Sequence, residues 1–315
     1  MLANGYQRVI KKAGKILYLL TADFMDIIVR CFTLMKYRST LISSGRAMAA
    51  LLTFATTSLA TAKDKEPLTI QDSVSDAAVS EVNGKLDATY GKIDDTYTRG
   101  LFGSLSLPVG HTFGVQFDGL YAHANDDDFY GAAGHFFARK PEQGLIGVAL
   151  GGLYSGDIES YVAVVEGEYY FDKVTLGGYA GYNNVQTDIR FPTFNTDLRD
   201  ENNFAVLNLY AAVYPIENLM VKFEYANRVE RNFYSVQVEY QTPVRGLSVF
   251  VDAGVGDHHY SHLLGGLRYY FGSDKTLKSR HRHDDPPNIL NGMEQGSVAG
   301  AGNEAAPQPA SLPPT

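Results

Sequence analysis

The sequence predicts an all-β protein: a single transmembrane antiparallel β-barrel of about twelve strands, with disordered extensions at both ends. Three observations predict this fold. Between residues 81 and 272, short segments alternate apolar and polar residues with a period of two, which is the period of a β-strand. Aromatic residues on the apolar face collect at the ends of these segments, and tight turns separate many of them.

The segments expected to be strands follow one another closely along the chain. They are residues 81–90, 99–108, 112–124, 129–139, 145–154, 160–171, 174–182, 203–214, 218–228, 233–241, 246–255 and 260–271. In 246–255, Leu247 and Val249 lie on one face, and Ser248 and Asp252 lie on the other. A shift of one residue would turn the charged residues toward lipid, so the sequence specifies the register well.

Outward-facing aromatic residues are expected in two rings, as at the two interfaces of a bilayer. One ring would hold Tyr90, Tyr121, Tyr130, Tyr154, Tyr161, Tyr182, Tyr225 and Tyr234, and the other Phe113, Tyr169, Phe171, Tyr240, Tyr269 and Phe271. Connections such as 108–111, 171–173 and 215–218 are short, whereas 91–98 and 183–202 are expected to be longer loops. An even number of strands brings both termini to the short-turn side, which predicts that both termini are periplasmic in a Gram-negative cell.

The two ends of the chain have their own patterns. A basic start, an apolar stretch from Ala47 to Leu59 and the site Ala60-Thr61-Ala62 predict a signal peptide over residues 35–62. Residues 1–34 are expected to be a leader that is cleaved or that reflects a start codon assigned too early. Residues 63–80 are expected to form a periplasmic linker or short helix, 81–272 the barrel, and 273–315 a disordered periplasmic tail with too few apolar residues for a core.

Composition excludes several classes of function. The formal net charge of −8 argues against nucleic acid as a partner. The single cysteine, Cys31, falls in the part expected to be removed, which excludes thiol-based redox, metal and nucleophile chemistry. We therefore expect no cofactor.

Polar residues on the inward face are expected to line the lumen. They are Asp118, His135, Arg139, Glu166, Glu168, Lys222, Glu224, Arg228, Glu239, Asp252, His262 and Arg268. One interpretation is structural, because opposite charges inside a barrel neutralise one another. The other is a narrow, mildly cation-preferring pore, since carboxylates outnumber the cations in this set. The predicted function is a porin-like channel or a structural barrel.

The alternative is an outer-membrane hydrolase with a site near the rim, suggested by His258-His259-Tyr260-Ser261-His262. In a strand, however, Ser261 and His262 point to opposite faces, and no companion carboxylate motif stands out. We therefore predict no catalytic residue and no metal site. The acidic stretches 94–95 and 126–128 suggest contact with lipopolysaccharide through divalent ions, alongside outer-membrane lipid. The oligomeric state stays open.

The last strand carries Gly266, Tyr269 and Phe271 in a pattern that resembles the recognition signal of the barrel-assembly machinery. Leu264 departs from the pattern, because a polar residue is usual at that place. Together with KSRHRHDDPPN (278–288), this end resembles a family of proteobacterial, porin-like outer-membrane β-barrels of unassigned function. The resemblance implies the assembly machinery as a partner and brings no catalytic residues.

Overall fold

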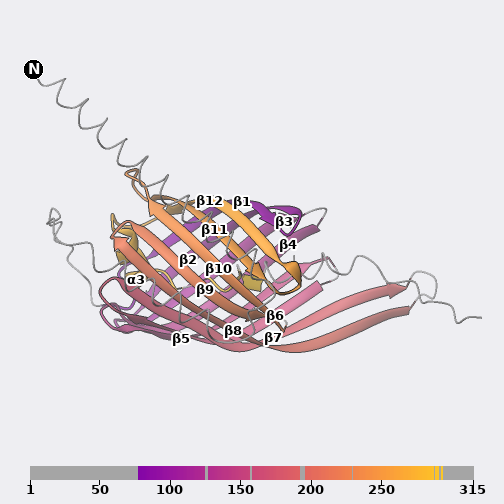
Figure 1. The fold of residues 1–315 in the computed structure, drawn as a ribbon. Coiled ribbons are helices and arrows are strands. Elements are labelled where there is room, and N and C mark those ends of the chain that lie inside the picture. Colours follow the sequence, from indigo (N-terminus) through magenta and orange to yellow (C-terminus); the bar gives the residue numbers. More distant parts are fainter. Residues whose placement is uncertain are drawn as a thin grey trace, which may run out of the picture. The chain divides into compact units, whose positions relative to one another are not determined.

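The computed structural model describes residues 77–124, 127–156, 158–191, 196–228, 230–286, 288–290 and 292–293. These residues form a closed antiparallel β-barrel (Figure 1). The expected leader, the signal peptide, residues 63–76 and residues 294–315 lie outside the described residues, so those predictions remain predictions.

The barrel has twelve strands, as the sequence predicts. They are β1 (Asn83–Ile93), β2 (Thr96–Val109), β3 (Phe113–Ala124), β4 (Asp127–Lys140), β5 (Gly144–Ser155), β6 (Ile158–Tyr170), β7 (Val174–Phe191), β8 (Thr196–Ile216), β9 (Leu219–Arg228), β10 (Arg231–Gln241), β11 (Leu247–Gly256) and β12 (Ser261–Tyr270). The described helical elements are the 3₁₀ turn η1 (Asp257–His259), the short helix α3 (Leu277–His283) and the helical residues Leu290 and 292–293. Among the described residues, no helix is long and apolar enough to cross a membrane.

The sheet closes where β1 pairs with β12, from Lys85 opposite Tyr270 to Ile93 opposite His262. Every other strand pairs with its neighbours in the chain, so the strand order is that of a simple meander. Closure leaves no free sheet edge along the wall. We call the end where β1 begins and β12 ends the near mouth, and the opposite end the far mouth.

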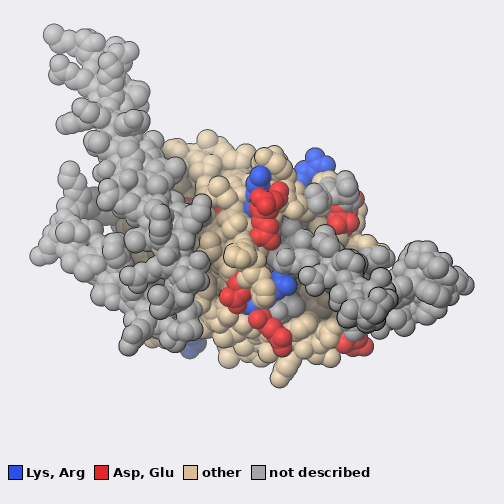
Figure 2. Space-filling model, turned by 45° about the vertical axis from the view of Figure 1, so that its right-hand side comes forward, with Lys and Arg blue, Asp and Glu red and all other residues tan. Residues whose placement is uncertain are grey.

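The two faces of the wall differ as the alternation predicts. Outward residues in the middle of strands are large and apolar, for example Ile146 and Leu150 on β5, which are 67% and 65% exposed. Aromatic pairs stand toward the strand ends, including Tyr121 with Tyr130 and Tyr169 with Phe171, whose ring centres are 5.4 and 4.8 Å apart. On the face shown in Figure 2, most of the visible charged side chains lie in the centre and the right-hand half, and the surface elsewhere is mainly uncharged. Such a continuous apolar surface fits lipid and not water.

Two stretches expected to be loops are strands. Residues 183–191 and 196–202 continue β7 and β8, which pair out to Phe191 opposite Thr196, and these two strands extend past the others in Figure 1. Likewise β1 and β2 run to the two-residue turn at 94–95, where Asp94 adopts a φ of 53°. Strand pairing satisfies backbone groups that a loop would leave to water. The contrast between short turns and long loops is therefore smaller than expected.

The prediction of a disordered tail over 273–315 is wrong for its described residues. α3 packs at the near mouth, and Leu277, Ile289, Leu290 and Met293 are buried among side chains of the barrel wall. Four apolar residues spread over this stretch are too few for a core of their own. They are enough to complete a core whose other residues the barrel supplies.

We expect Leu150→Arg to lower the free energy of unfolding in lipid vesicles by roughly 2–4 kcal/mol, because it places a charge in the middle of the lipid-facing band. Val244→Arg is the control, since Val244 is exposed in the connection between β10 and β11. Denaturant titration of both refolded variants measures the effect. Equal stability of the two variants would contradict a lipid-facing β5.

Candidate functional site: the barrel interior

The inner face of the wall carries all the charged residues that the sequence predicts to line the lumen. Asp118, His135, Arg139, Glu166, Arg228, Glu239, His262 and Arg268 are buried, and Glu168, Lys222, Glu224 and Asp252 are half-buried. The alternation of burial turns them away from the apolar outer surface. Most of them fall into three clusters.

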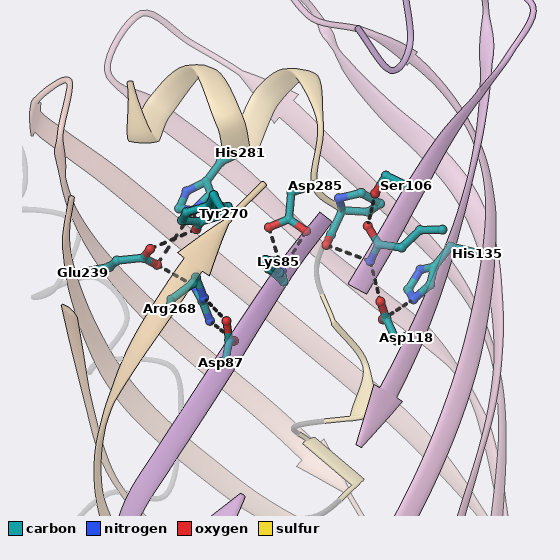
Figure 3. A network of polar contacts seen from close by, with 12 residues as sticks. Lys85, Asp87, Ser106, Asp118, His135, Glu239, Arg268, Tyr270, His281 and Asp285 are labelled. Atoms are coloured by element: carbon teal, nitrogen blue, oxygen red, sulfur yellow. Dashed lines mark hydrogen bonds and ion pairs between the residues drawn. The ribbon is translucent and has the colours of Figure 1, made fainter. Parts of the chain in front are cut away.

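Arg268 on β12 is held between two carboxylates (Figure 3). Its Nε and Nη2 each donate to Asp87 at 2.7 Å, and its Nη1 donates to Glu239. The guanidinium also lies 4.9 Å from the centre of the Phe250 ring. A Cβ at Gly266 would lie 2.6 Å from that ring, so Gly266 leaves room for it. The positive charge thus has two charged partners and an aromatic face, all from the wall.

His135 on β4 lies between two carboxylates as well. Its Nε2 is 3.1 Å from Asp118, and its Nδ1 is 3.0 Å from Glu166. Gln116 donates to Asp118 at 2.9 Å and accepts a hydrogen bond from Ser106 at 2.8 Å. Donation from both ring nitrogens to carboxylates requires the imidazolium form. His135 then acts as the cation between two acidic groups that would otherwise repel each other.

The third cluster lies on β9 and its neighbour. Glu224 accepts from Lys222 at 3.0 Å and from Arg228 at 3.1 Å. Asn208 on β8 donates to the same carboxylate at 2.7 Å. All three clusters therefore pair charges within the wall itself: the first two join different strands, and in the third the ion pairs lie along β9.

Arg139 and Glu168 lie near the near mouth. Glu168 accepts hydrogen bonds from the hydroxyls of Tyr170 and Tyr210. Arg139 donates to the backbone oxygen of Ala78 at 3.3 Å, and its Nε and Nη2 have no hydrogen-bond partner among the described residues.

The histidine-rich motif does not form a catalytic site. His258 and His259 are exposed in η1, and Ser261 is exposed while His262 is buried. The His262 Nε2 lies 3.3 Å from Asp252, and its Nδ1 lies 3.0 Å from the Tyr260 hydroxyl. Ser261 and His262 therefore point to opposite faces, as predicted. Within the described part of the chain, no group of three His, Cys, Asp or Glu residues is arranged to hold a metal ion.

The chain returns to the near mouth after β12 and enters the barrel. We call its described residues 277–286, 288–290 and 292–293 the insert. Arg282 of α3 donates to the backbone oxygens of Phe171, in the β6–β7 connection, and Val174, the first residue of β7, and Arg280 donates to the backbone oxygen of Ser273 at 3.0 Å. These carbonyl groups lie in the connections and at a strand end of the near mouth. The arginines thus anchor the insert across this mouth.

Beyond α3, the insert contacts the wall in the near half of the barrel. Asp285 forms an ion pair with Lys85 on β1, with an oxygen-to-Nζ distance of 2.6 Å, and both side chains are almost fully buried. Gln116 on β3 lies 3.4 Å from the backbone oxygen of Pro286. A cavity lined by Lys85, Asp285 and their neighbours measures about 10 Å³, room for about one water molecule. The insert therefore fills the space next to Lys85.

Farther along, the insert fills the interior toward the far mouth. Ile289 lies against Gly151, where a Cβ would come within 3.2 Å of its methyl group, and Leu290 is completely buried. The backbone oxygen of Gly292 accepts from Arg228 at 3.1 Å. Because Arg228 is the last residue of β9, the insert spans the barrel from the near mouth almost to the far mouth.

His281 of α3 forms further polar contacts between the insert and the wall. The Tyr214 hydroxyl lies 2.9 Å from its Nδ1, the Tyr270 hydroxyl lies 2.9 Å from its Nε2, and Tyr270 donates to Glu239 at 2.9 Å. One neutral tautomer satisfies this chain: Tyr214 donates to Nδ1, and Nε2–H donates to Tyr270. Burial lowers the pKa of His281 to about 4, outweighing the nearby carboxylates, so the ring is neutral at pH 7.

Several members of these clusters are missing from the sequence-predicted set. Lys85 and Asp87 show the inward half of an alternation with Leu86 and could have been found from it. Gln116, His281 and Asp285 could not, because nothing in a polar stretch shows that it enters a barrel.

The residues that resemble an assembly signal lie on both faces of β12. Tyr269 and Phe271 are exposed on the outer face, with ring centres 5.1 Å apart. Leu264, which departs from the signal, is buried in the same apolar cluster as Ile289 and Leu290. An apolar residue at this place is therefore explained by the insert that covers it.

No protein-family model and no curated protein matches the sequence. Solved structures of similar fold include the KdgM porin, at 10% identity and a TM-score of 0.46, covering 60% of this chain and 99% of that one. The NanC porin gives 11% identity and a TM-score of 0.46, covering 58% and 98%. Outer membrane protein Omp33 of Acinetobacter baumannii gives 10% identity and a TM-score of 0.40, covering 61% and 99%. These neighbours are barrels, and at such values the likeness says nothing about what this chain does.

We expect the insert to bind the barrel less tightly as the pH falls from 6.5 toward 4. Against the wall, His281 has a pKa of about 4, compared with 6.5 for a free histidine. Only the released insert takes up a proton in this range, so binding weakens by up to roughly a hundredfold, and above pH 6.5 the effect of His281 disappears. The charged and titratable groups around the ring are Tyr214, Glu239, Arg268, Tyr270, Lys85 and Asp285.

A nitroxide spin label on Lys278→Cys in α3, in a Cys31→Ser chain, reports this release as increased mobility. The same label in a His281→Gln chain is the control, and its mobility should respond less to pH, because only His283 of α3, whose pKa burial also lowers, then remains. An equal pH response of the two chains would show that His281 is not the group responsible.

Proposed function

We propose that this protein is a narrow, porin-like channel of the outer membrane. The observation that carries the proposal is the charge-paired inner wall, in which Arg268, His135 and Glu224 each find opposite charges on the wall itself. A barrel with only a structural role would be served by an apolar interior, because buried ion pairs add little stability over well-packed apolar side chains. A polar wall suits a lumen that holds water and solutes. Twelve strands are intermediate between filled small barrels and open large porins.

The charge balance of the inner wall favours cations. The inward-facing carboxylates of the strands are Asp87, Asp118, Glu166, Glu168, Glu224, Glu239 and Asp252, against the cations Lys85, Arg139, Lys222, Arg228 and Arg268. His135 reduces the excess of negative charge without removing it. An aqueous path along this wall would therefore conduct cations better than anions.

The enzyme alternative has no support from the described geometry. The histidine motif lacks a nucleophile and base within hydrogen-bond reach, since Ser261 and His262 point to opposite faces.

Purified full-length protein in a planar bilayer should show brief, infrequent openings, because the insert occupies the lumen. Under a KCl gradient, the reversal potential should shift toward the equilibrium potential of K⁺. Glu224→Gln should reduce this shift, whereas Glu217→Gln, at the exposed β8–β9 turn, should leave it unchanged. An absence of openings at every voltage would rule out a channel, and anion preference would contradict the assigned charge balance.

We also propose that the near mouth faces the periplasm and that the assembly machinery recognises β12. Support comes from the outward aromatic pair Tyr269 and Phe271 at the end of the closing strand. A membrane-impermeant maleimide on intact cells should label Asp95→Cys at the far mouth and spare Val244→Cys at the near mouth. The reverse labelling would invert the orientation.

A further inference from the structure

The contacts of the insert differ in kind from those within the wall. The wall cations Arg268, His135 and Lys222 have wall carboxylates as partners. Lys85 is different, because its described ion pair is with Asp285 of the insert. Withdrawal of the insert would therefore leave the ion pairs within the three wall clusters in place and deprive Lys85 of this partner.

The apolar contacts of the insert favour the state in which it stays inside the barrel. From the middle of the barrel toward the far mouth, the inner wall carries an apolar patch, which Ile289, Leu290 and Met293 cover. The patch consists of Phe102, Leu120, Phe129, Leu153, Val162 and Leu264. Exposure of these side chains to water is unfavourable, so the covered state is the resting state. Gly131 and Gly151 of the wall lie beside Leu290 and Ile289, and their lack of a side chain leaves room for these two residues.

We propose that the insert is a tethered plug, which closes the channel at rest and opens it by withdrawing through the near mouth, with the Lys85–Asp285 pair as its latch. The proposal rests on the proposed channel function. The direction follows from the connection to β12, which joins the insert to the wall at the near mouth, where α3 is anchored on backbone carbonyls. Opening exposes a lumen in which the three wall clusters keep their ion pairs and Lys85 no longer contacts Asp285.

A charge swap in the full-length chain tests the latch. Lys85→Glu and Asp285→Lys each place like charges together in a buried site. The double variant Lys85→Glu with Asp285→Lys restores an opposite pair at the same place. Lys278→Glu and Glu217→Lys, with their double variant, form the matched control, because this pair also lies 2.7 Å apart but Glu217 is half exposed.

Two measurements follow the plug. The first is the rate at which an impermeant maleimide modifies Leu290→Cys in a Cys31→Ser chain at constant pH. The second is the open probability in a planar bilayer. Each single latch variant should raise both by roughly a hundredfold or more, the double variant should return both close to the starting values, and the control set should change neither by more than about twofold. Asp285→Asn, which keeps the side-chain shape, should give an intermediate rise and replaces any latch variant that fails the heat-modifiability test for a folded barrel.

The outcomes separate the two proposals. Unchanged labelling in the single variants, or no recovery in the double variant, overturns the plug even if the protein conducts. Increased labelling without any conductance supports a removable insert and rules out the channel.

Discussion

The structure depends on one constraint: a charge on the inner face of a closed barrel must find a partner of opposite charge on the wall or on the insert. Burial without a partner costs several kcal/mol per charge, so each inward charge restricts the register of the strands around it. Arg268 joins β12 to β1 through Asp87 and to β10 through Glu239. The strand pair that closes the barrel is thus held by an ion pair as well as by its backbone hydrogen bonds.

The same constraint divides the interior into two parts. Toward the near mouth the wall is charged and paired, and the insert adds to it with Asp285 and His281. Toward the far mouth the inner wall carries an apolar patch beside charged residues such as Arg228 and His262, and the insert covers this patch with Ile289 and Leu290. One segment therefore meets both kinds of surface in the order in which it passes them. This match explains how a stretch with few apolar residues becomes ordered.

Sequence reasoning succeeded where the pattern is local. The alternation of Leu247 and Val249 with Ser248 and Asp252 predicts both the strand and which residues face inward, because the period of two is a property of neighbouring residues. It failed for residues 183–202, because their polar sequence is typical of a loop. The pairing of β7 with β8 depends on both strands together and is not visible in either one alone. It also failed for the insert, because Leu277, Ile289 and Leu290 look isolated until the barrel supplies their neighbours. His281 lies between Tyr214 on β8 and Tyr270 on β12, and both lie on other elements than α3. Its role was therefore not visible in the sequence.

The central claim is that the three charged clusters of the wall are paired within the wall and do not need the insert. A structure of the chain ending at Ser273 tests it most directly. The account predicts a twelve-stranded barrel with an open lumen in which Arg268 still contacts Asp87 and Glu239, and His135 still lies between Asp118 and Glu166. A chain that fails to form a barrel, or a barrel in which these contacts are rearranged, would contradict it.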